Sequence, residues 1–228
     1  MGRALEQIAH ERGHKVVQII EIGEEQKFKS PQFLNSDVAI EFTSPDSADN
    51  NFNLCLNAGI RLVSGTTGWS MDIEKYKNLC SKNNTAFFYA PNFSIGVNIL
   101  FEINRKLAEL LKSFPDYNAS IEETHHIHKL DKPSGTAIAI ANDIIKQNAK
   151  YTDWKNEKKE DANILAVKSV REGEIIGQHT VKWENEIDNI KIEHTAKNRK
   201  GFTLGAMLAA EFIKNKTGVF TMKDLLNI

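Results

Sequence analysis

"DVAIEFTSPDSADNNFNLCLNAGIRLVSGTTG", residues 37–68, contains a strand-like segment, a helical segment and a second strand-like segment in direct succession. The apolar runs in 37–42 and 61–65 are typical of buried strands, and 46–58 has helical spacing. Strand and helix in alternation indicate a parallel sheet wrapped by helices.

The same alternation extends in both directions along the chain. We expect helices at 3–13 and 71–83, and strands at 15–22 and 85–90. The fold prediction for this part is therefore a Rossmann-like, doubly wound α/β domain with a parallel sheet.

The pattern changes after Asn92. The segment 94–114 keeps helical periodicity, and one further helix is expected after Ser134. The other segments are strand-like, and they are 117–124, 163–173, 177–185 and 190–196. Clustered strands of this kind predict an α+β domain with an open mixed sheet.

These two patterns divide the chain into two domains. A C-terminal segment, 202–228, returns to helix and is apolar enough to pack against the first domain. We therefore expect 1–93 and 202–228 to form one domain, and 94–201 to form a second.

Charge and cysteine content narrow the class of protein. The 228 residues carry a formal net charge of -1, which favours a small-molecule ligand over nucleic acid. Cys55 and Cys80 lack metal-ligand spacing, and we expect free thiols in the cytoplasm. No apolar run is long enough to span a bilayer, so we expect no membrane association.

Three polar loops are expected at the carboxyl ends of the parallel strands, where doubly wound sheets bind ligands. They are FTSP at 42–45, GTTG at 65–68 and APNFS at 90–94. The glycines of GTTG would let the backbone approach a ligand closely, and its threonines offer hydroxyls. Taken alone, GTTG is also typical of an ordinary turn. The repetition at successive strand ends favours a cofactor site.

Glu21 is a candidate for binding the ribose of a dinucleotide. It lies 19 positions after Gly2, where such folds place a carboxylate that accepts from the 2′-hydroxyl. A solvated residue at a strand end is an equal alternative. The cations that follow, Lys27 and Lys29, give a 2′-phosphate no arginine clamp, which favours NADH over NADPH.

The segment ETHHIHKLDKPSGTA, 123–137, concentrates proton donors. In an extended strand His126 and His128 would share one face and His125 the other, so the three histidines do not converge as a metal site requires. Histidines that only satisfy structural hydrogen bonds are one alternative. A metal-hydrolase site is another, less favoured because the HxHxDH spacing is not completed.

Ser134 is predicted to be the N-cap of a helix that begins at Gly135. The first amides of that helix would have no helical partners and would attract an anion. With Lys129 and His126 nearby, this helix end suits a carboxylate, and His125 is free to donate a proton.

HHIHKLDKPSGTA, 125–137, resembles HHxxKxDAPSGTA, the signature of the 4-hydroxy-tetrahydrodipicolinate reductase family, with Lys132 in place of alanine. FTSP, GTTGW, APNFSIGVN and HTAKNRKGFTLGA match further family segments in the same order and cover nearly the whole chain. The resemblance implies an enzyme of lysine and diaminopimelate biosynthesis. It would transfer a hydride from NADH or NADPH to a cyclic dicarboxylate, which loses its hydroxyl as water.

The family pattern implies roles for individual residues. The catalytic matches are His125, the general acid, and its companion Lys129. The substrate-binding matches are His126, Gly135 and Thr136. The cofactor-binding matches are Gly2, Gly65, Thr67, Ala90 and Phe93. The family also implies a homotetramer assembled through the sheet of the second domain.

The start of the chain departs from the family. The GxGxMG turn is represented only by Met1 and Gly2, and the first strand is absent. Loss of a central strand would leave backbone groups of its neighbours unpaired. The simplest interpretation is an incomplete chain of a reductase. The alternative is a non-catalytic binding or assembly protein that has lost its cofactor site.

Overall fold

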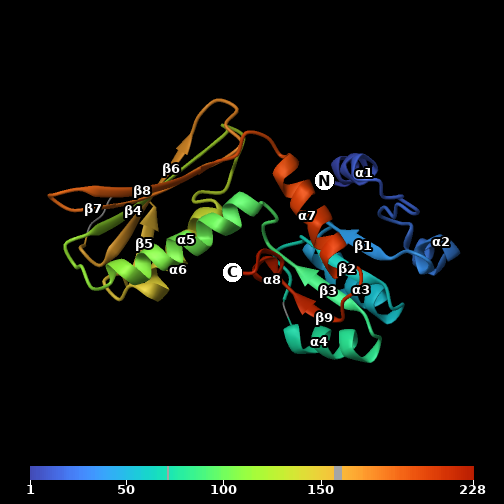
Figure 1. Cartoon of the computed structure of the whole chain (residues 1–228). Helices are drawn as coiled ribbons and strands as arrows, with labels where there is room; N and C mark the ends of the chain where they lie inside the picture. The colour runs from blue at the N-terminus through green and yellow to red at the C-terminus, as the bar shows by residue number, and fades with distance from the viewer. Residues whose placement is uncertain (71, 157–160) are drawn as a thin grey trace. The chain divides into compact units, whose positions relative to one another are not determined.

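The structure, a computed structural model, describes the chain except residues 71 and 157–160. It forms two compact units (Figure 1). The first unit consists of 1–95 and 200–228, and the second consists of 96–199.

The first unit is built on a parallel sheet in the order β1-β2-β3-β9. Its strands are β1 Val38–Glu41, β2 Arg61–Ser64, β3 Ala86–Tyr89 and β9 Gly218–Phe220. Glu41 pairs in register with Ser64, and Ser64 with Tyr89, so the first three strands end side by side. The parallel sheet predicted from the alternation is confirmed.

Helices cover both faces of this sheet, because successive strand residues point to opposite sides. Leu62 and Phe87 pack in one core with side chains of α3 and α4. Val63 and Phe88 pack in a second core with side chains of α1, α7 and α8. The helices of this unit are α1 Gly2–Glu11, α2 Pro31–Leu34, α3 Pro45–Asn57, α4 Ile73–Lys82, α7 Lys200–Ile213 and α8 Met222–Leu226, with a short 3₁₀ helix at Glu25–Lys29.

The strand predicted at 15–22 is not formed, which corrects the sequence prediction. The expected alternation is present in the side chains, because Val16 and Ile20 are half-buried while Val17 and Ile19 are exposed. A strand also requires backbone hydrogen bonds to a neighbour. Within the described part of the chain, no strand pairs with this segment.

The prediction that the C-terminal segment, 202–228, is helical is also corrected, because the segment contains a strand. β9 lies between α7 and α8 and pairs in parallel with β3, from Gly218 opposite Ala86 to Phe220 opposite Phe88. Valine and phenylalanine favour strands, and this pairing extends the sheet by one strand. Of the helix predicted at 71–83, residue 71 lies outside the described residues.

The second unit is built on a mixed sheet in the order β5-β6-β4-β7-β8. The central strand β4 is parallel to β6 and antiparallel to β7. The strands are β4 Asn118–His125, β5 Asp153–Asn156, β6 Ile164–Arg171, β7 Gln178–Glu184 and β8 Asn189–Thr195. The open mixed sheet predicted for this part of the chain is confirmed.

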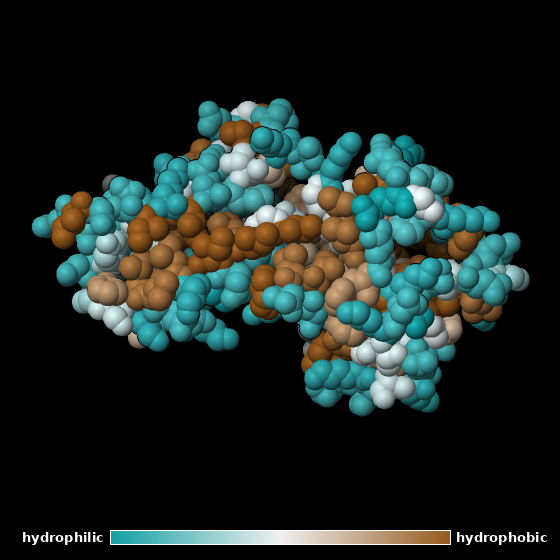
Figure 2. Space-filling view, in the orientation of Figure 1, coloured by the Kyte–Doolittle hydropathy of each residue, from teal (hydrophilic) through white to brown (hydrophobic). Residues whose placement is uncertain are grey.

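Two helices, α5 (Ile95–Leu111) and α6 (Gly135–Gln147), pack on one face of the mixed sheet. Their apolar residues form one core with Ile121, Val181 and Trp183 of the strands. Figure 2 shows apolar side chains gathered along the region where α5 is drawn, and α5 carries exposed isoleucines and leucine. Among the described residues, no helix is long and apolar enough to cross a membrane.

Candidate active site

The candidate site begins with the alternation of side chains along β4. Ala119, Ile121, Glu123 and His125 occupy every second position and are all buried, as part of the face that α5 and α6 cover. The first two are apolar and belong to the core. The row therefore changes from apolar to ionisable at its C-terminal end, where a carboxylate and an imidazole are adjacent on one face.

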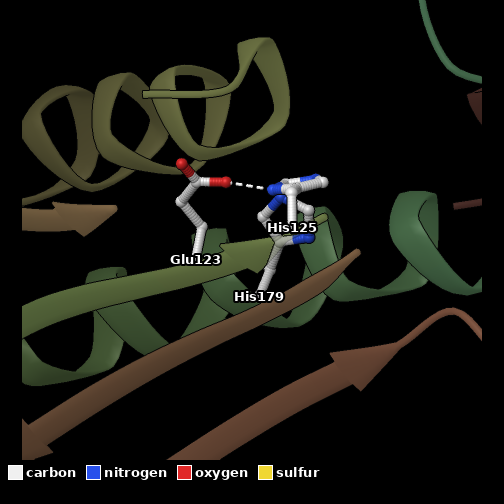
Figure 3. Close-up of side chains that lie close together, drawn as sticks. All are labelled: Glu123, His125 and His179. Carbon is white, nitrogen blue, oxygen red and sulfur yellow. Dashed lines mark ion pairs between the residues drawn. The ribbon is translucent and has the colours of Figure 1, made fainter. Parts of the chain in front are cut away.

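The Glu123 carboxylate is completely buried between the imidazole of His125 and the guanidinium of Arg171. One oxygen forms an ion pair with Nδ1 of His125, which Figure 3 shows directed at the carboxylate. The other oxygen lies 2.9 Å from Nη1 of Arg171, which is opposite His125 on β6. Burial alone would raise the pKa of Glu123, but the polar groups of His125, Ser169 and Arg171 around the carboxylate outweigh it and lower the pKa to about 2.

His179 joins this pair from β7, where it is opposite Glu123 in the sheet. Its ring centroid is 5.1 Å from that of His125, with the rings nearly perpendicular (Figure 3). Burial, together with the nearby His125, lowers the pKa of His179 to about 3. His179 is therefore neutral at ordinary pH.

His179 connects the histidine pair to the start of α6. Its Nε2 lies 3.1 Å from Oγ of Ser134, and that oxygen also accepts a hydrogen bond from the amide of Ala137 at 3.2 Å. Ser134 is thus the N-cap predicted from the sequence. Gly135 is exposed and Thr136 half-buried, so the first turn of α6 lies at the surface next to the buried histidines.

The ligand-capable atoms of Glu123, His125 and His179 all lie within 4.8 Å of one another. Such a cluster could hold a metal ion in principle. Here the guanidinium of Arg171 is already in contact with the carboxylate. A metal ion would bring a second cation against that group and displace the imidazole that contacts it, so the residues favour an ion-paired histidine.

The loop after β4 carries the other predicted residues. The strand ends at His125, so the two-residue alternation does not continue, and the rings of His126 and His128 lie 5.9 Å apart. Lys129 Nζ is 2.8 Å from Oδ1 of Asp131. Arg171 also donates to the backbone carbonyls of Lys129 and Asp131, at 3.2 and 2.5 Å. The same arginine therefore contacts Glu123 and holds this loop.

Three residues of this site were not identified from the sequence, namely Glu123, Arg171 and His179. Glu123 had a local signal, because it lies two residues before His125 on the same face of a strand. Arg171 and His179 come from strands distant in sequence. Their proximity depends on the register of β6 and β7, which short-range patterns do not specify.

In the first unit, the loops predicted to bind a cofactor lie at one edge of the sheet, after β1, β2 and β3. The buried carboxylate of Glu41 holds two of them together. It accepts hydrogen bonds from the amide and hydroxyl of Thr43, from the hydroxyl of Ser64 at 2.6 Å and from that of Thr66 at 2.8 Å. The third loop is joined by the amide of Ala90, which donates to the carbonyl of Ser64 at 3.2 Å.

The glycine at position 65 has a role inside the protein. A Cβ atom there would lie 2.0 Å from the ring of Phe42, so Gly65 leaves space for that ring. Ala90 and Phe93 are each 2 % exposed, and their side chains pack in the core. The side chains of Ala90 and Phe93 therefore face the interior of the first unit.

The remaining predicted cofactor residues are exposed. Thr67 lies at the surface of the loop after β2. Gly2 is the first residue of α1, and Glu21 lies at the start of a turn, where its carbonyl accepts from the amide of Glu24 at 3.1 Å. Their exposed positions leave each of these residues accessible to a ligand.

Comparison with known proteins agrees with this architecture. Residues 1–93 match the family "Dihydrodipicolinate reductase, N-terminus", and residues 96–226 match "Dihydrodipicolinate reductase, C-terminus". The chain is 45% identical over 227 residues to 4-hydroxy-tetrahydrodipicolinate reductase of Christiangramia forsetii, covering 100% of this chain and 94% of that protein. It is 36% identical over 198 residues to the protein of the same name from Methanopyrus kandleri, covering 84% and 72%.

A solved structure is also similar. Dipicolinate-bound dihydrodipicolinate reductase from Paenisporosarcina sp. TG-14 aligns with a TM-score of 0.72 at 25% identity, covering 96% of this chain and 92% of that one. Two matching family descriptions and full-length identity to a curated relative agree. The chain belongs to the dihydrodipicolinate reductase family.

Proposed function

We propose that this chain is a 4-hydroxy-tetrahydrodipicolinate reductase, which transfers a hydride from NAD(P)H to the cyclic substrate and gives tetrahydrodipicolinate and water. The observation that carries the proposal is the 45% identity over the whole chain to a curated reductase of that name. The site supports it, because His125 lies beside His179, whose ring contacts the N-cap of α6.

We assign binding of a substrate carboxylate to the first turn of α6. The amides of Gly135 and Thr136 lie at a helix N-terminus, where partial positive charge favours an anion. His126 and Lys129, both half-buried on the preceding loop, are the cationic or hydrogen-bonding groups assigned to the same dicarboxylate. The relative from Paenisporosarcina sp. TG-14 binds dipicolinate, which is a dicarboxylate of this kind.

Proton balance requires an acid in this reaction. The substrate gains a hydride and loses its hydroxyl as water, so one proton must be supplied for each turnover. We assign His125 as the donor, with Lys129 as the second catalytic residue, because His125 has a carboxylate that stabilises its charged form. A reduced nicotinamide supplies the hydride when it is bound.

The residues at the sheet edge of the first unit fit a nicotinamide cofactor. We assign Gly65, Thr67 and the loop from Ala90 to Phe93 to the nicotinamide, because hydrogen bonds from Thr66 to Glu41 and from the amide of Ala90 to Ser64 join these loops. We assign the remaining contacts to Gly2 and to Glu21, whose carboxylate favours the ribose of NADH. The unit formed by 1–93 and 202–228 is thus the dinucleotide-binding domain.

We assign 94–201 as the substrate-binding domain and as the assembly surface of a homotetramer. Every second side chain of its sheet points away from α5 and α6, and this free face carries ion pairs such as Lys168 with Glu122 at 2.7 Å. Light scattering of the purified protein tests the assembly, with a mass of four chains expected. The free thiols of Cys55 and Cys80 agree with a cytoplasmic enzyme.

The decisive test of function is His125→Gln in a steady-state assay with freshly generated substrate. We expect kcat to fall by roughly 100-fold or more while KM changes little, because an acid acts in the transition state. His128→Gln is the matched control, since His128 is exposed on the same loop beside Glu174. Wild-type kcat in H125Q would remove His125 from the mechanism.

Nucleotide binding distinguishes the reductase from the alternative function, which is a non-catalytic binding protein of this family. Titration of the purified chain with NADH, followed by nicotinamide fluorescence, should show saturable binding if the loops after β1, β2 and β3 form a cofactor site. Absence of both binding and turnover would favour the non-catalytic protein.

A further inference from the structure

The position of Glu123 is unusual for a carboxylate, because its neighbours in the same row, Ala119 and Ile121, are core residues. A fully buried charge requires compensation, since removal from water costs several kcal/mol. Arg171 supplies the compensation on one side. On the other side the carboxylate contacts a histidine that is assigned a chemical role.

The contact with Glu123 determines which ring nitrogen of His125 carries the hydrogen in the neutral form. Nδ1 faces a carboxylate oxygen and is sealed from solvent. A nitrogen in that position must carry a hydrogen, because two acceptors facing each other would repel. Nε2 is then the atom available to give a proton to a substrate.

The surroundings of Nε2 agree with this assignment. A Cβ atom at Gly177, the residue immediately before β7, would lie 3.1 Å from Nε2 of His125 and 3.9 Å from Cε1 of His179. Gly177 therefore places bare backbone beside this nitrogen, where any other residue would place a side chain.

The charged groups around His125 come from several elements. Glu123 contacts it on β4, Arg171 is its neighbour on β6, and His179 lies beside it on β7. Lys129 lies on the following loop, and His194 is opposite His179 on β8. Burial lowers the pKa values of both His179 and His194, which favours their neutral forms. Glu123 is the anion in direct contact with the ring.

We propose that Glu123, held by Arg171, is the positioning residue for proton transfer, because it fixes the His125 ring with Nδ1 protonated and stabilises its positive charge. The proposal rests on the assignment of His125 as the acid. Glu123 itself does not touch the substrate and acts through the histidine.

The first test uses the unmodified protein. ¹⁵N NMR of imidazole-labelled protein, with His125 assigned from H125Q, reports which nitrogen keeps its hydrogen in the neutral form. We expect the Nδ1–H form, whereas free histidine in water favours Nε2–H. An Nε2–H form for His125 would overturn the proposal, and the measurement does not depend on catalysis.

The second test is the pH dependence of kcat/KM in Glu123→Gln. Glutamine keeps an oxygen acceptor but loses the charge, so the His125 imidazolium should give up its proton at lower pH. We expect the alkaline limb of the profile to move down by about one unit or more, which corresponds to about a tenfold loss of kcat/KM on that limb.

Glu122→Gln is the matched control for this test. Glu122 is the preceding residue on β4, points to the opposite face and is ion-paired with Lys168. The variant makes the same change of charge on the same strand. Because Glu122 lies on the face assigned to assembly, light scattering checks the mass of the variant, and its alkaline limb should fall at the same pH as that of the unmodified protein. Glu123→Asp, which keeps the charge, should restore the alkaline limb.

The outcomes distinguish the role of Glu123 from the role of His125. An E123Q profile that coincides with that of E122Q would contradict the role of Glu123. If E123Q does not fold, as circular dichroism would show, the NMR result on the unmodified protein decides. Full activity in H125Q together with an Nδ1–H tautomer would overturn the proposed acid and leave the Glu123 contact established.

Discussion

At the scale of single residues, two glycines of α7 show how closely the backbone of the first unit is packed. A Cβ atom at Gly205 would lie 1.8 Å from the carbonyl oxygen of Phe93. The same atom at Gly201 would lie 3.9 Å from Oγ of Ser94, which is an ordinary contact. Gly205 therefore lets α7 touch the 90–94 loop, and Gly201 is not required for that contact.

We predict that Gly205→Ala lowers the free energy of unfolding by about 1–3 kcal/mol, because the added methyl group overlaps backbone atoms that must move. Gly201→Ala, in the same helix, should be neutral or slightly stabilising, since alanine favours helix over glycine. Urea unfolding of the two variants checks this. Equal stabilities would contradict the close contact.

The residues of the candidate site differ in how far the sequence identified them. His125 lies in a cluster of histidines, and Ser134 precedes a helical pattern as a cap. Both patterns are local in sequence, so they can be recognised without knowing which residues are in contact in the fold. Arg171 contacts Glu123 from another strand, so its role depends on strand register. Register is set by the packed sheet as a whole, which explains why this residue was found only in the structure.

At the scale of elements, the start of α6 combines two functions in Ser134. Its hydroxyl oxygen caps the helix, and the same group contacts the buried ring of His179. The cap thus holds the proposed carboxylate-binding turn in a fixed relation to the histidines. Ser30 caps α2 in the same way through the amide of Phe33 at 3.2 Å, without a buried histidine.

We predict that Ser134→Ala lowers the free energy of unfolding by about 2 kcal/mol or more. Loss of the cap costs about 1 kcal/mol, and leaving His179 Nε2 buried without a partner adds a comparable penalty. Ser30→Ala should lose the cap and a long hydrogen bond of 3.4 Å to Oε1 of Gln18, but it leaves no buried histidine without a partner, so its loss should be smaller. Urea unfolding of both variants is the measurement, and equal losses would show that the bond to His179 contributes nothing.

Strand prediction shows the limit of sequence patterns for whole elements. The segment 15–22 has the composition and alternation of a strand, yet β1 has a strand partner on only one side within the described residues. β9 was missed for the opposite reason, because its short sequence is a weak signal and its pairing with β3 makes it a strand. In both segments, pairing decided the structure.

At the scale of the whole molecule, the two units carry separate parts of the proposed chemistry. Each has its own sheet and its own hydrophobic core. The nicotinamide cofactor is assigned to loops of the first unit, and the dicarboxylate to the loop and helix around 126–136 of the second. Each ligand should therefore affect a different part of the chain.

We predict that hydrogen exchange of the purified protein slows in 42–45, 65–68 and 90–94 when NADH is added. Dipicolinate should instead slow exchange in 126–136. The physical reason is that a bound ligand stabilises the segment it contacts against local opening. Mass spectrometry of peptides from the two ligand-bound samples gives the comparison. Protection of the same peptides by both ligands, each added alone, would contradict the assignment.

The contacts of Glu41 limit how the loops assigned to the cofactor can be redesigned. Its carboxylate ties Thr43 of one loop to Thr66 of the next, so the two loops behave as one part. A loop transplanted alone from a relative with another cofactor preference would leave hydroxyls or carboxylate oxygens buried without partners. A successful graft would have to transfer both loops and the end of β1 together.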